Sequence, residues 1–293
     1  KNYNYIKKSF LVDTVMVIPN NFYKRIKFYF EIFGFKCSKA IVLDGKKKSI
    51  LSAILLRCDN KILLTNKNLY KSLFKPFFKK IFFSNDKNSK IDELISISSY
   101  LNFDFKISSA KYKNELNIDK NMEKIINEII NFNLFHFDEK WILSDYIKNY
   151  ENIEPNNIQL INFINSLVVN TNNNLIITTG LKNNHLISFL KSIFKRINDN
   201  TFSYIYEKKI IFLFEKIDIF NLEYIISKSS NIITCHGAPS HLSNMYDKNL
   251  IDVIDKSEDQ VFKNWTSHFT NYKSFYREDF AHLSLKIIDE LKN

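Results

Sequence analysis

The chain has 293 residues, which on the usual scale of about 100–200 residues per domain predicts two domains. Hydrophobic residues make up 45% and aromatic residues 15%, which excludes global disorder, while only four glycines and four prolines exclude collagen-like or linker-rich architectures. The cysteines Cys37, Cys58 and Cys235 have neither the spacing of a disulfide framework nor that of a zinc site, so we expect a reduced, cytosolic compartment. No apolar run approaches the roughly 18–20 residues of a membrane-spanning helix, so any membrane contact is expected to be peripheral.

The net charge of +11 is concentrated in one half of the chain. Residues 1–131 hold 25 Lys and Arg against 12 Asp and Glu, a balance of +13, whereas residues 132–293 hold 17 against 19, a balance of −2. A basic half favours phosphate-bearing partners, whether nucleic acid, anionic lipid or a phosphorylated glycan. Codon bias in an AT-rich genome is an alternative source of the lysines, but it explains the asymmetry less well.

Short β-branched runs alternate with longer stretches of helical period, which is typical of an α/β protein with parallel sheets. Strands are expected at 14–18, 40–44, 61–65, 79–84, 132–137, 175–179, 202–206, 231–235 and 250–254. Helices are expected at 22–33, 49–57, 91–101, 122–130, 158–168, 186–197 and 221–228, and an amphipathic terminal helix at 279–291. The helical period breaks near Phe132, so we predict two doubly wound domains, 1–131 and 132–293.

Three of the four glycines follow an expected strand and precede an expected helix: Gly45, Gly180 and Gly237. This position is the carboxyl edge of a parallel sheet, where ligands bind and where glycine lets the backbone approach a phosphate. For any one glycine, a tight turn between strand and helix is the alternative. The chain has no GxGxxG and no GxxxxGK[ST] sequence, so dinucleotide-binding and P-loop interpretations have no motif behind them.

The strongest local signal follows the strand that ends at Cys235. A helix is expected to begin near Pro239, so that the backbone N–H groups from Ala238 to His241 point outward and favour an anion. The side chains of His241 and His236 can reach the same ligand. The alternative is that both histidines are satisfied by backbone carbonyl groups.

A second signal is Lys140, which comes directly after the strand expected at 132–137. It is expected at the same sheet edge as Gly180 and Gly237, where a lysine can neutralise a diphosphate. The alternative is a loop lysine paired with Asp138 or Glu139.

A third signal lies in the basic half, again at a strand end: Asp44, Gly45, Lys46 and Ser49. These residues are candidates for binding an anionic acceptor, and a solvated helix start is the alternative.

At these residues the chain resembles glycosyltransferase family 9, the heptosyltransferase-like enzymes of bacterial lipopolysaccharide assembly. Pro239 and His241 match the family's second-domain turn, while His236 replaces the family's Asp and Gly237 stands one place earlier than its glycine. The Asp-Glu-Lys-Trp segment around Lys140 and the IVLDGKKKS segment in the first half are similar to two further family segments.

The resemblance implies the GT-B fold of two Rossmann-like domains, the first of them incomplete. It implies a nucleotide-sugar donor, no metal and no cofactor. The residues expected to bind the donor's diphosphate and sugar are Lys140, Thr179, Gly180, His236, Gly237, Ala238, Ser240 and His241. The family's first strand and helix, with its catalytic base, are expected in about 50–60 residues upstream of Lys1, so the base is left unassigned.

The resemblance therefore predicts sugar transfer from a nucleotide-diphosphate sugar to a lipopolysaccharide-type or other cell-surface glycan or glycolipid. The expected place is the cytoplasm, at the inner face of a bacterial inner membrane. Alternatives are another nucleotide-sugar enzyme such as an epimerase, a non-catalytic binding relative, or a basic nucleic-acid-binding protein. Against the last, the lysines are scattered over strands and helices and no nucleic-acid recognition motif stands out, so we expect no nucleic-acid partner.

Overall fold

The computed structural model of the chain describes residues 6–7, 12–85, 88–103, 118–142, 153–182 and 184–292. The chain divides into two compact units. The first unit comprises Lys1–Ile107 with Lys263–His268, and the second comprises Ser108–Phe262 with Phe269–Asn293. The division after Ile107 comes earlier in the chain than the expected boundary at residue 131.

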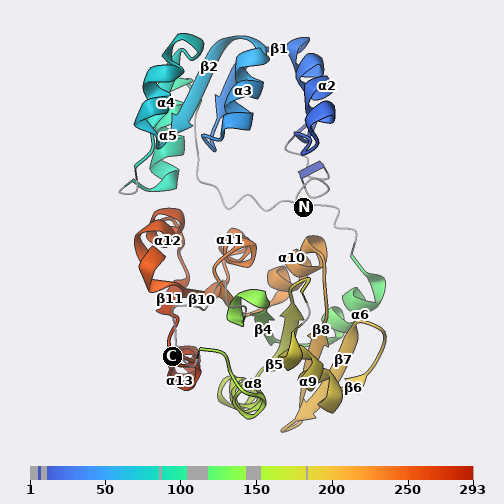
Figure 1. Cartoon of the computed structure of the whole chain (residues 1–293). Coiled ribbons are helices and arrows are strands. Elements are labelled where there is room, and N and C mark those ends of the chain that lie inside the picture. The colour runs from blue at the N-terminus through green and yellow to red at the C-terminus, as the bar shows by residue number, and fades with distance from the viewer. Residues whose placement is uncertain are drawn as a thin grey trace. The chain divides into compact units, whose positions relative to one another are not determined.

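The first unit is built on a parallel sheet of strand order β1-β2-β3 (Figure 1). Its strands are β1 (Lys36–Val42), β2 (Arg57–Thr65) and β3 (Lys80–Phe83). Its helices are α2 (Phe22–Phe33), α3 (Lys47–Leu55), α4 (Asn68–Leu73) and α5 (Lys90–Tyr100), with a 3-10 turn η1 (Lys75–Phe77).

Helices cover both faces of this sheet. Successive residues of the central strand β2 point to opposite faces, so neighbouring side chains of the strand pack against different helices. Leu63 packs with Ile50 of α3 on one face, in a cluster that α4 also joins. Ile62 and Leu64 pack with Ile97 of α5 on the other face. This is the doubly wound arrangement that the sequence predicts.

The second unit is built on an eight-stranded sheet of order β11-β10-β9-β4-β5-β8-β7-β6. Its strands are β4 (Phe132–Phe137), β5 (Asn174–Thr179), β6 (Lys195–Arg196), β7 (Thr201–Tyr206), β8 (Lys209–Phe214), β9 (Asn231–Cys235), β10 (Asn249–Ile254) and β11 (Tyr272–Tyr276). The strands from β11 to β8 pair in parallel, and β7 pairs antiparallel with β8 and with β6.

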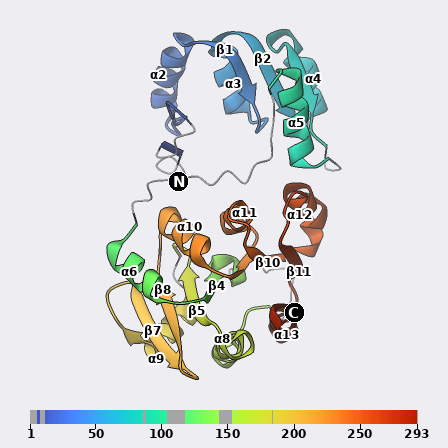
Figure 2. The ribbon, with the colours of Figure 1, turned by 180° about the vertical axis from the view of Figure 1, so that it is seen from behind.

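Helices cover both faces of this sheet as well (Figures 1 and 2). The helices are α6 (Lys120–Glu128), α8 (Asn157–Thr171), α9 (His185–Ile193), α10 (Ile219–Lys228), α11 (Ala238–Met245) and α13 (Phe280–Lys292), with 3-10 turns η2 (Glu139–Trp141) and η3 (Lys256–Glu258). Helix α12 (Asp259–Thr266) is divided between the two units after Phe262. Helices α8, α9 and α13 bury one face of the strands, and α6, α10 and α11 bury the other. The predicted α/β class is therefore confirmed.

Helix α6 packs on the second unit, although its residues lie before the expected domain boundary. Its Met122 and Ile126 are buried in one cluster with Leu134 of β4. In addition, the hydroxyl of Tyr224 donates to Oδ1 of Asn127 at 2.8 Å. A break in helical period thus marks the start of β4, whereas the division between the two units comes earlier.

Some expected elements are absent from the described structure, and some observed elements were not expected. Residues 14–18 form no strand within the described chain, and the apolar side chains of Met16 and Val17 are exposed there. The sequence did not predict strand β8, because the hairpin turn before it consists of Glu207 and Lys208. These residues have φ of 50° and 64°, the left-handed values for which Asn-Gly is the usual signal.

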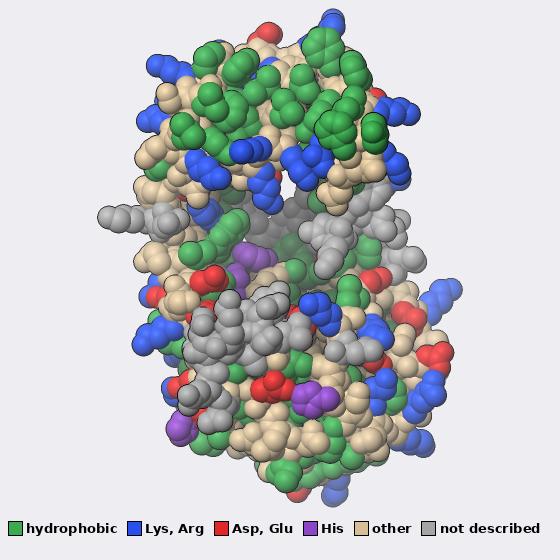
Figure 3. Space-filling view, viewed as in Figure 1, with side chains coloured by type: hydrophobic (Ala, Val, Ile, Leu, Met, Phe, Trp, Pro, Cys, Tyr) green, Lys and Arg blue, Asp and Glu red, His purple; other side chains and the backbone are tan. Residues whose placement is uncertain are grey.

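Helix α2 buries only two of its side chains, Phe28 and Ile32, and leaves other large hydrophobic side chains exposed. Figure 3 shows hydrophobic side chains gathered on the first unit, with lysine and arginine side chains beside them. The exposed large hydrophobic residues of α2 are Phe22, Tyr23, Ile26, Phe30 and Phe33. Among the described residues, no helix is both long enough and apolar enough to span a membrane.

Candidate functional site

The candidate site lies at the carboxyl edge of the sheet in the second unit. From β4 the chain continues to β5 on one side, and later returns to place β9 on the other side of β4. In open parallel sheets such a reversal of strand order creates a crevice at the carboxyl ends of the two strands, and ligands bind there. Turn η2 follows β4 and helix α11 follows β9, so both segments singled out by the sequence lie at this reversal.

Lys140 bridges the two segments. Its Nζ donates to the backbone oxygen of His236 at 2.8 Å and lies 3.5 Å from Oδ2 of Asp138. A Cβ added to Gly237 would lie less than 3.0 Å from that Nζ, so the missing side chain of the glycine makes room for the ammonium group. The structure thus brings the predicted Lys140, His236 and Gly237 together, and it also realises the alternative pairing of Lys140 with Asp138.

Buried polar groups hold η2 in place. Oδ1 of Asp138 accepts the backbone N–H of Lys140 at 3.0 Å, and the indole N–H of Trp141 donates to the backbone oxygen of His136 at 3.0 Å. Nδ1 of His136 lies 2.8 Å from Oγ1 of Thr178. Burial lowers the pKa of His136, outweighing the carboxylate of Asp138 that raises it, so His136 is neutral near pH 7.

Gly180 makes room for a neighbouring side chain too. A Cβ added there would lie less than 3.0 Å from a carboxylate oxygen of Glu139. The preceding Thr179 is buried, and its hydroxyl accepts the backbone N–H of Lys216 at 2.9 Å and donates to the oxygen of Gly180 at 3.1 Å. At this strand end the glycine therefore admits an acidic side chain, and Thr179 organises the turn.

His236 is tied to a buried carboxylate that the sequence analysis missed. Its Nδ1 lies 2.6 Å from Oδ2 of Asp252, a residue of β10 with no exposed surface. The hydroxyl of Ser240 donates to Oδ1 of Asp252 at 3.0 Å, and that of Tyr272 donates to Oδ2 at 3.3 Å. Ser240 is fully buried, and its hydroxyl belongs to this network.

The start of α11 offers fewer N–H groups than the sequence analysis expected. Pro239 has none, and the N–H of Gly237 donates to the hydroxyl of Ser240 at 3.2 Å. The N–H groups of Ser240 and His241 both donate to the oxygen of Gly237, at 3.1 and 3.4 Å. Of the four residues from Ala238 to His241, only Ala238 keeps an N–H that makes no hydrogen bond within the described chain. Expecting an array of outward N–H groups was wrong, because the turn satisfies them itself.

His241 lies beside His236 on the same turn. The two imidazole rings stand edge to face with centroids 5.5 Å apart, and His241 meets the ring of Phe269 in the same way at 5.4 Å. His241 is exposed, whereas the side chain of His236 is only 12% exposed. The two predicted histidines therefore share one surface.

The acceptor candidates form the start of α3 in the first unit. The hydroxyl of Ser49 and the backbone N–H of Lys46 both donate to the carboxylate of Asp44, at 2.8 and 3.1 Å. Gly45 has φ of +56°, a left-handed conformation that favours glycine. These contacts match the alternative of a helix start, and Lys46 itself remains exposed.

Two further charged residues at the carboxyl edge were not predicted. Asp252 interrupts the otherwise apolar and buried run Leu250–Ile254, and a single acid within a buried strand is the signal that could have revealed it. Arg277 follows β11, is buried, and lies close enough to Cys235 for its charge to act on the pKa of that thiol. Burial dominates there and raises the pKa of Cys235.

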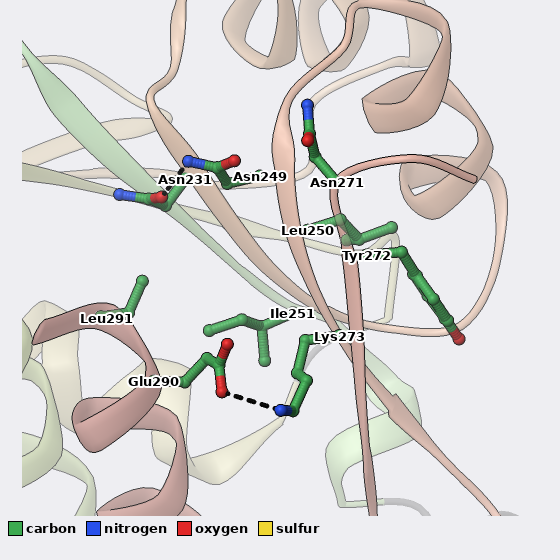
Figure 4. Close-up of a pocket in the computed structure, with 9 residues that line it drawn as sticks. All are labelled: Asn231, Asn249, Leu250, Ile251, Asn271, Tyr272, Lys273, Glu290 and Leu291. Carbon is green, nitrogen blue, oxygen red and sulfur yellow. Dashed lines mark hydrogen bonds and ion pairs between the residues drawn. The ribbon is translucent and has the colours of Figure 1, made fainter. Parts of the chain in front are cut away.

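A separate cavity of about 460 Å³ opens at the opposite, amino edge of β9, β10 and β11 (Figure 4). Four of its polar side chains pair with one another: Nδ2 of Asn249 donates to Oδ1 of Asn231 at 3.1 Å, and Lys273 forms an ion pair with Glu290 at 3.2 Å. Within the described residues, no group of three or more His, Cys, Asp or Glu side chains is arranged to hold a metal ion.

The sequence matches no protein-family profile and no curated protein, but solved structures share its fold. A family 9 glycosyltransferase from Veillonella parvula has 10% identity and a TM-score of 0.62, over 98% of this chain and 78% of that one. UDP-GlcNAc 2-epimerase from Methanocaldococcus jannaschii has 10% identity and a TM-score of 0.58, over 100% of this chain and 82% of that one. The Escherichia coli heptosyltransferase WaaC with ADP has 10% identity and a TM-score of 0.56, over 92% and 77%.

These matches extend over both units of the chain. At 10% identity they establish the fold and not the substrates. The chain has the GT-B fold of family 9 glycosyltransferases and heptosyltransferases, which the UDP-GlcNAc 2-epimerase shares.

Proposed function

We propose that this chain is a glycosyltransferase that takes its sugar from a nucleotide-diphosphate sugar. The observation that carries the proposal is the bridge from Lys140 to the backbone oxygen of His236, which lies where the strand order reverses between β4 and β9. A lysine at this edge of the sheet suits a diphosphate. The fold shared with family 9 glycosyltransferases supports the same reaction class.

In the proposed reaction a hydroxyl of the acceptor attacks the anomeric carbon of the sugar and gives its proton to a base. The bond between the sugar and the diphosphate breaks, and its electron pair stays with the diphosphate. Stabilising that developing charge is the main electrostatic task, and fixed cationic groups can perform it without a metal ion. We assign this task to Lys140, with His236 and His241 on the adjoining turn.

For the acceptor we propose a cell-surface glycan or glycolipid. Residues 1–131 carry the chain's excess positive charge, which suits a phosphorylated glycan or the anionic face of a bacterial inner membrane, on its cytoplasmic side. In the first unit, Lys46 at the exposed start of α3 is the candidate for meeting such a group.

Thermal unfolding with ADP, UDP, GDP and CDP tests the donor site. At a ligand concentration of about 100 times Kd, binding adds about 2.7 kcal/mol to stability, so at least one nucleotide should raise the Tm by several degrees. Lys140→Ala should abolish the rise. Lys195→Ala, which removes an exposed lysine from edge strand β6, should retain it. If none of the four nucleotides raises the Tm of the wild type, the proposal fails.

An epimerase is the second candidate, because the structure of UDP-GlcNAc 2-epimerase matches 100% of this chain. The two reactions differ in their products. An epimerase changes the sugar of its nucleotide sugar without any acceptor, whereas a glycosyltransferase releases the nucleoside diphosphate when an acceptor is present. Mass spectrometry and NMR of a panel of nucleotide sugars, incubated with and without bacterial glycolipid, separate them. A binding-only relative would shift the Tm yet give neither product.

A further inference from the structure

Two of the three cysteines stand opposite each other in the sheet of the first unit. Strands β1 and β2 pair in parallel, and their register places Cys37 directly beside Cys58. Neighbouring strands lie about 4.7–4.9 Å apart, which falls within the range of Cα separations, about 4.4–6.8 Å, that a disulfide bridges. Strand pairing therefore brings together two thiols that are far apart in the sequence.

Both thiols lie on the same face of the sheet, because residues two apart in a strand share a face. Cys37 shares its face with Lys39, whose Nζ donates at 3.1 Å to the backbone oxygen of Leu101, the residue that follows α5. Cys58 shares its face with Ile62, which packs against α5. The side chains of both cysteines thus point to the side of the sheet that α5 covers.

The two thiols contact each other and can be reached from solvent. The thiol of Cys58 donates to the backbone oxygen of Asn60 at 3.5 Å, and the side chain of Cys37 is hydrogen-bonded to that of Cys58. Both side chains are half-buried and line an open hollow of about 470 Å³ near the amino ends of the two strands. A small oxidant can therefore reach this pair, whereas Cys235 has no exposed surface.

The hydrogen bond between the cysteines gives the two sulfurs different roles. Burial and the hydrogen bond to Cys58 raise the pKa of Cys37, outweighing the charge of Lys61, so Cys37 keeps its proton near pH 7. In a reactive pair one sulfur attacks the oxidant as a thiolate, and the second, resolving sulfur completes the disulfide. The firmly held proton of Cys37 fits the resolving role, which leaves the first attack to Cys58.

We propose that Cys37 and Cys58 form a reversible disulfide when the protein meets hydrogen peroxide, and that this bond locks β1 to β2. The sulfur of Cys58 attacks one peroxide oxygen, the O–O bond breaks, and the other oxygen leaves as water. The sulfur of Cys37 then attacks the sulfenic acid, so that the S–S bond forms and a second water leaves. Two thiols are oxidised to one disulfide, the peroxide is reduced to two waters, and exchange with an external thiol reverses the change.

The disulfide would hold the edge of the sheet. Among the described strands, β1 ends the order of its sheet and has β2 as its single partner. The bond closes a loop that contains α3, which restricts the unfolded chain and so stabilises the folded one. The loop also carries the acceptor candidates Asp44 and Lys46. No residue of the donor site takes part, so this inference is independent of the proposed function.

Counting thiols in the full 293-residue chain tests the proposal. The reduced protein is treated with hydrogen peroxide, unfolded, and labelled with N-ethylmaleimide. Untreated wild type should take up three labels, and oxidised wild type should take up one, on Cys235. Peptide mapping without reductant should find Cys37 linked to Cys58 within one chain, and dithiothreitol should restore all three labels. Oxidation should also raise the Tm by several degrees.

Three variants separate the pair from its members. Cys37→Ser and Cys58→Ser should form no disulfide within the chain and show no rise in Tm on oxidation. Dimedone, which traps sulfenic acids, should label Cys58 in Cys37→Ser more strongly than Cys37 in Cys58→Ser. Cys235→Ala is the matched control, because it removes a cysteine outside the pair, and it should still form the disulfide. If a serine variant does not fold, peptide mapping of the wild type decides.

Three results would overturn the inference. Oxidised wild type could keep three labels, its disulfide could join two chains or include Cys235, or its cysteines could reach sulfinic acid with no linked peptide. Equal dimedone labelling of the two serine variants would overturn the order of attack assigned to Cys58 and Cys37.

Discussion

The ammonium of Lys140 occupies the space where Gly237 lacks a side chain, and it donates at 2.8 Å to the backbone oxygen of the residue before that glycine. Gly237 itself has an extended backbone, with φ of 166°, which any residue can adopt. Glycine is therefore required at this position because a side chain would clash with Lys140, and not because of the backbone conformation. Turn η2 and the end of strand β9 are far apart in the sequence, and they fit together only because Gly237 has no Cβ.

This relationship makes Gly237→Ala a test of the site's geometry. The added methyl group would displace Nζ of Lys140, the far end of a flexible side chain, so the fold should survive with a loss of about 1–3 kcal/mol. Nucleotide binding, measured by calorimetry, should weaken together with it. Gly34→Ala is the control, because the nearest atom to its added Cβ is 3.5 Å away and its φ is −77°. Equal nucleotide affinity in Gly237→Ala and wild type would contradict the role given to Lys140.

Much of the fold could be predicted because local pattern and final environment agree. Strand β4 was placed correctly because four of its six residues are large and apolar, and all six are buried. The helix expected at 22–33 is α2 to the residue, although it is poorly buried, because Asn21 caps it and an apolar period runs through it. The hairpin between β7 and β8 was missed because Glu207 and Lys208 adopt a turn that their residue types do not signal.

The candidate site could be predicted in part. Sequence order placed Lys140, Gly180 and Gly237 at strand ends, and the parallel sheet brings such ends to one edge. Asp252 could not be connected with His236, because the two residues meet only through the pairing of β9 with β10. Nor does the sequence reveal that the side chain of Glu139 fills the space at Gly180. Long-range side-chain pairing of this kind depends on register, which local patterns leave open.

Protonation of His136 should destabilise the fold in acid. Burial lowers its pKa in the folded protein below the usual value near 6.5, so the unfolded chain binds more protons as the pH falls through that region. The stability contributed by neutral, buried His136 is therefore fully present above the unfolded-state pKa, and it is lost as the pH falls through the lower pKa of the folded state. Urea unfolding at about pH 7 and about pH 5 should show a smaller pH-dependent loss for His136→Gln than for wild type. Burial also lowers the pKa of His268, so part of the loss should persist; an unchanged loss would contradict the assignment to His136.

Helix α6 should contribute to the stability of the second unit. Ile126 is 2% exposed and packs in the cluster that contains Leu134, so Ile126→Ala should lower the free energy of unfolding by about 2–5 kcal/mol. Ile130→Ala makes the same chemical change just after the helix, at a side chain that is 80% exposed, and should cost less than about 0.5 kcal/mol. Equal effects of the two variants in urea unfolding would show that α6 does not pack as described.

The thiol of Cys235 should report on opening of the candidate site. Cys235 has no exposed surface, precedes His236, and has a pKa that burial raises, so little of the reactive thiolate is present or accessible in the folded protein. In a variant with both Cys37→Ser and Cys58→Ser, Cys235 is the only cysteine. Its reaction with Ellman's reagent at about pH 8 should be slow in the folded state and rapid in urea. A nucleotide that binds at the adjoining turn should slow the reaction further, whereas rapid stoichiometric labelling of the folded protein would contradict the burial of β9 and the site built upon it.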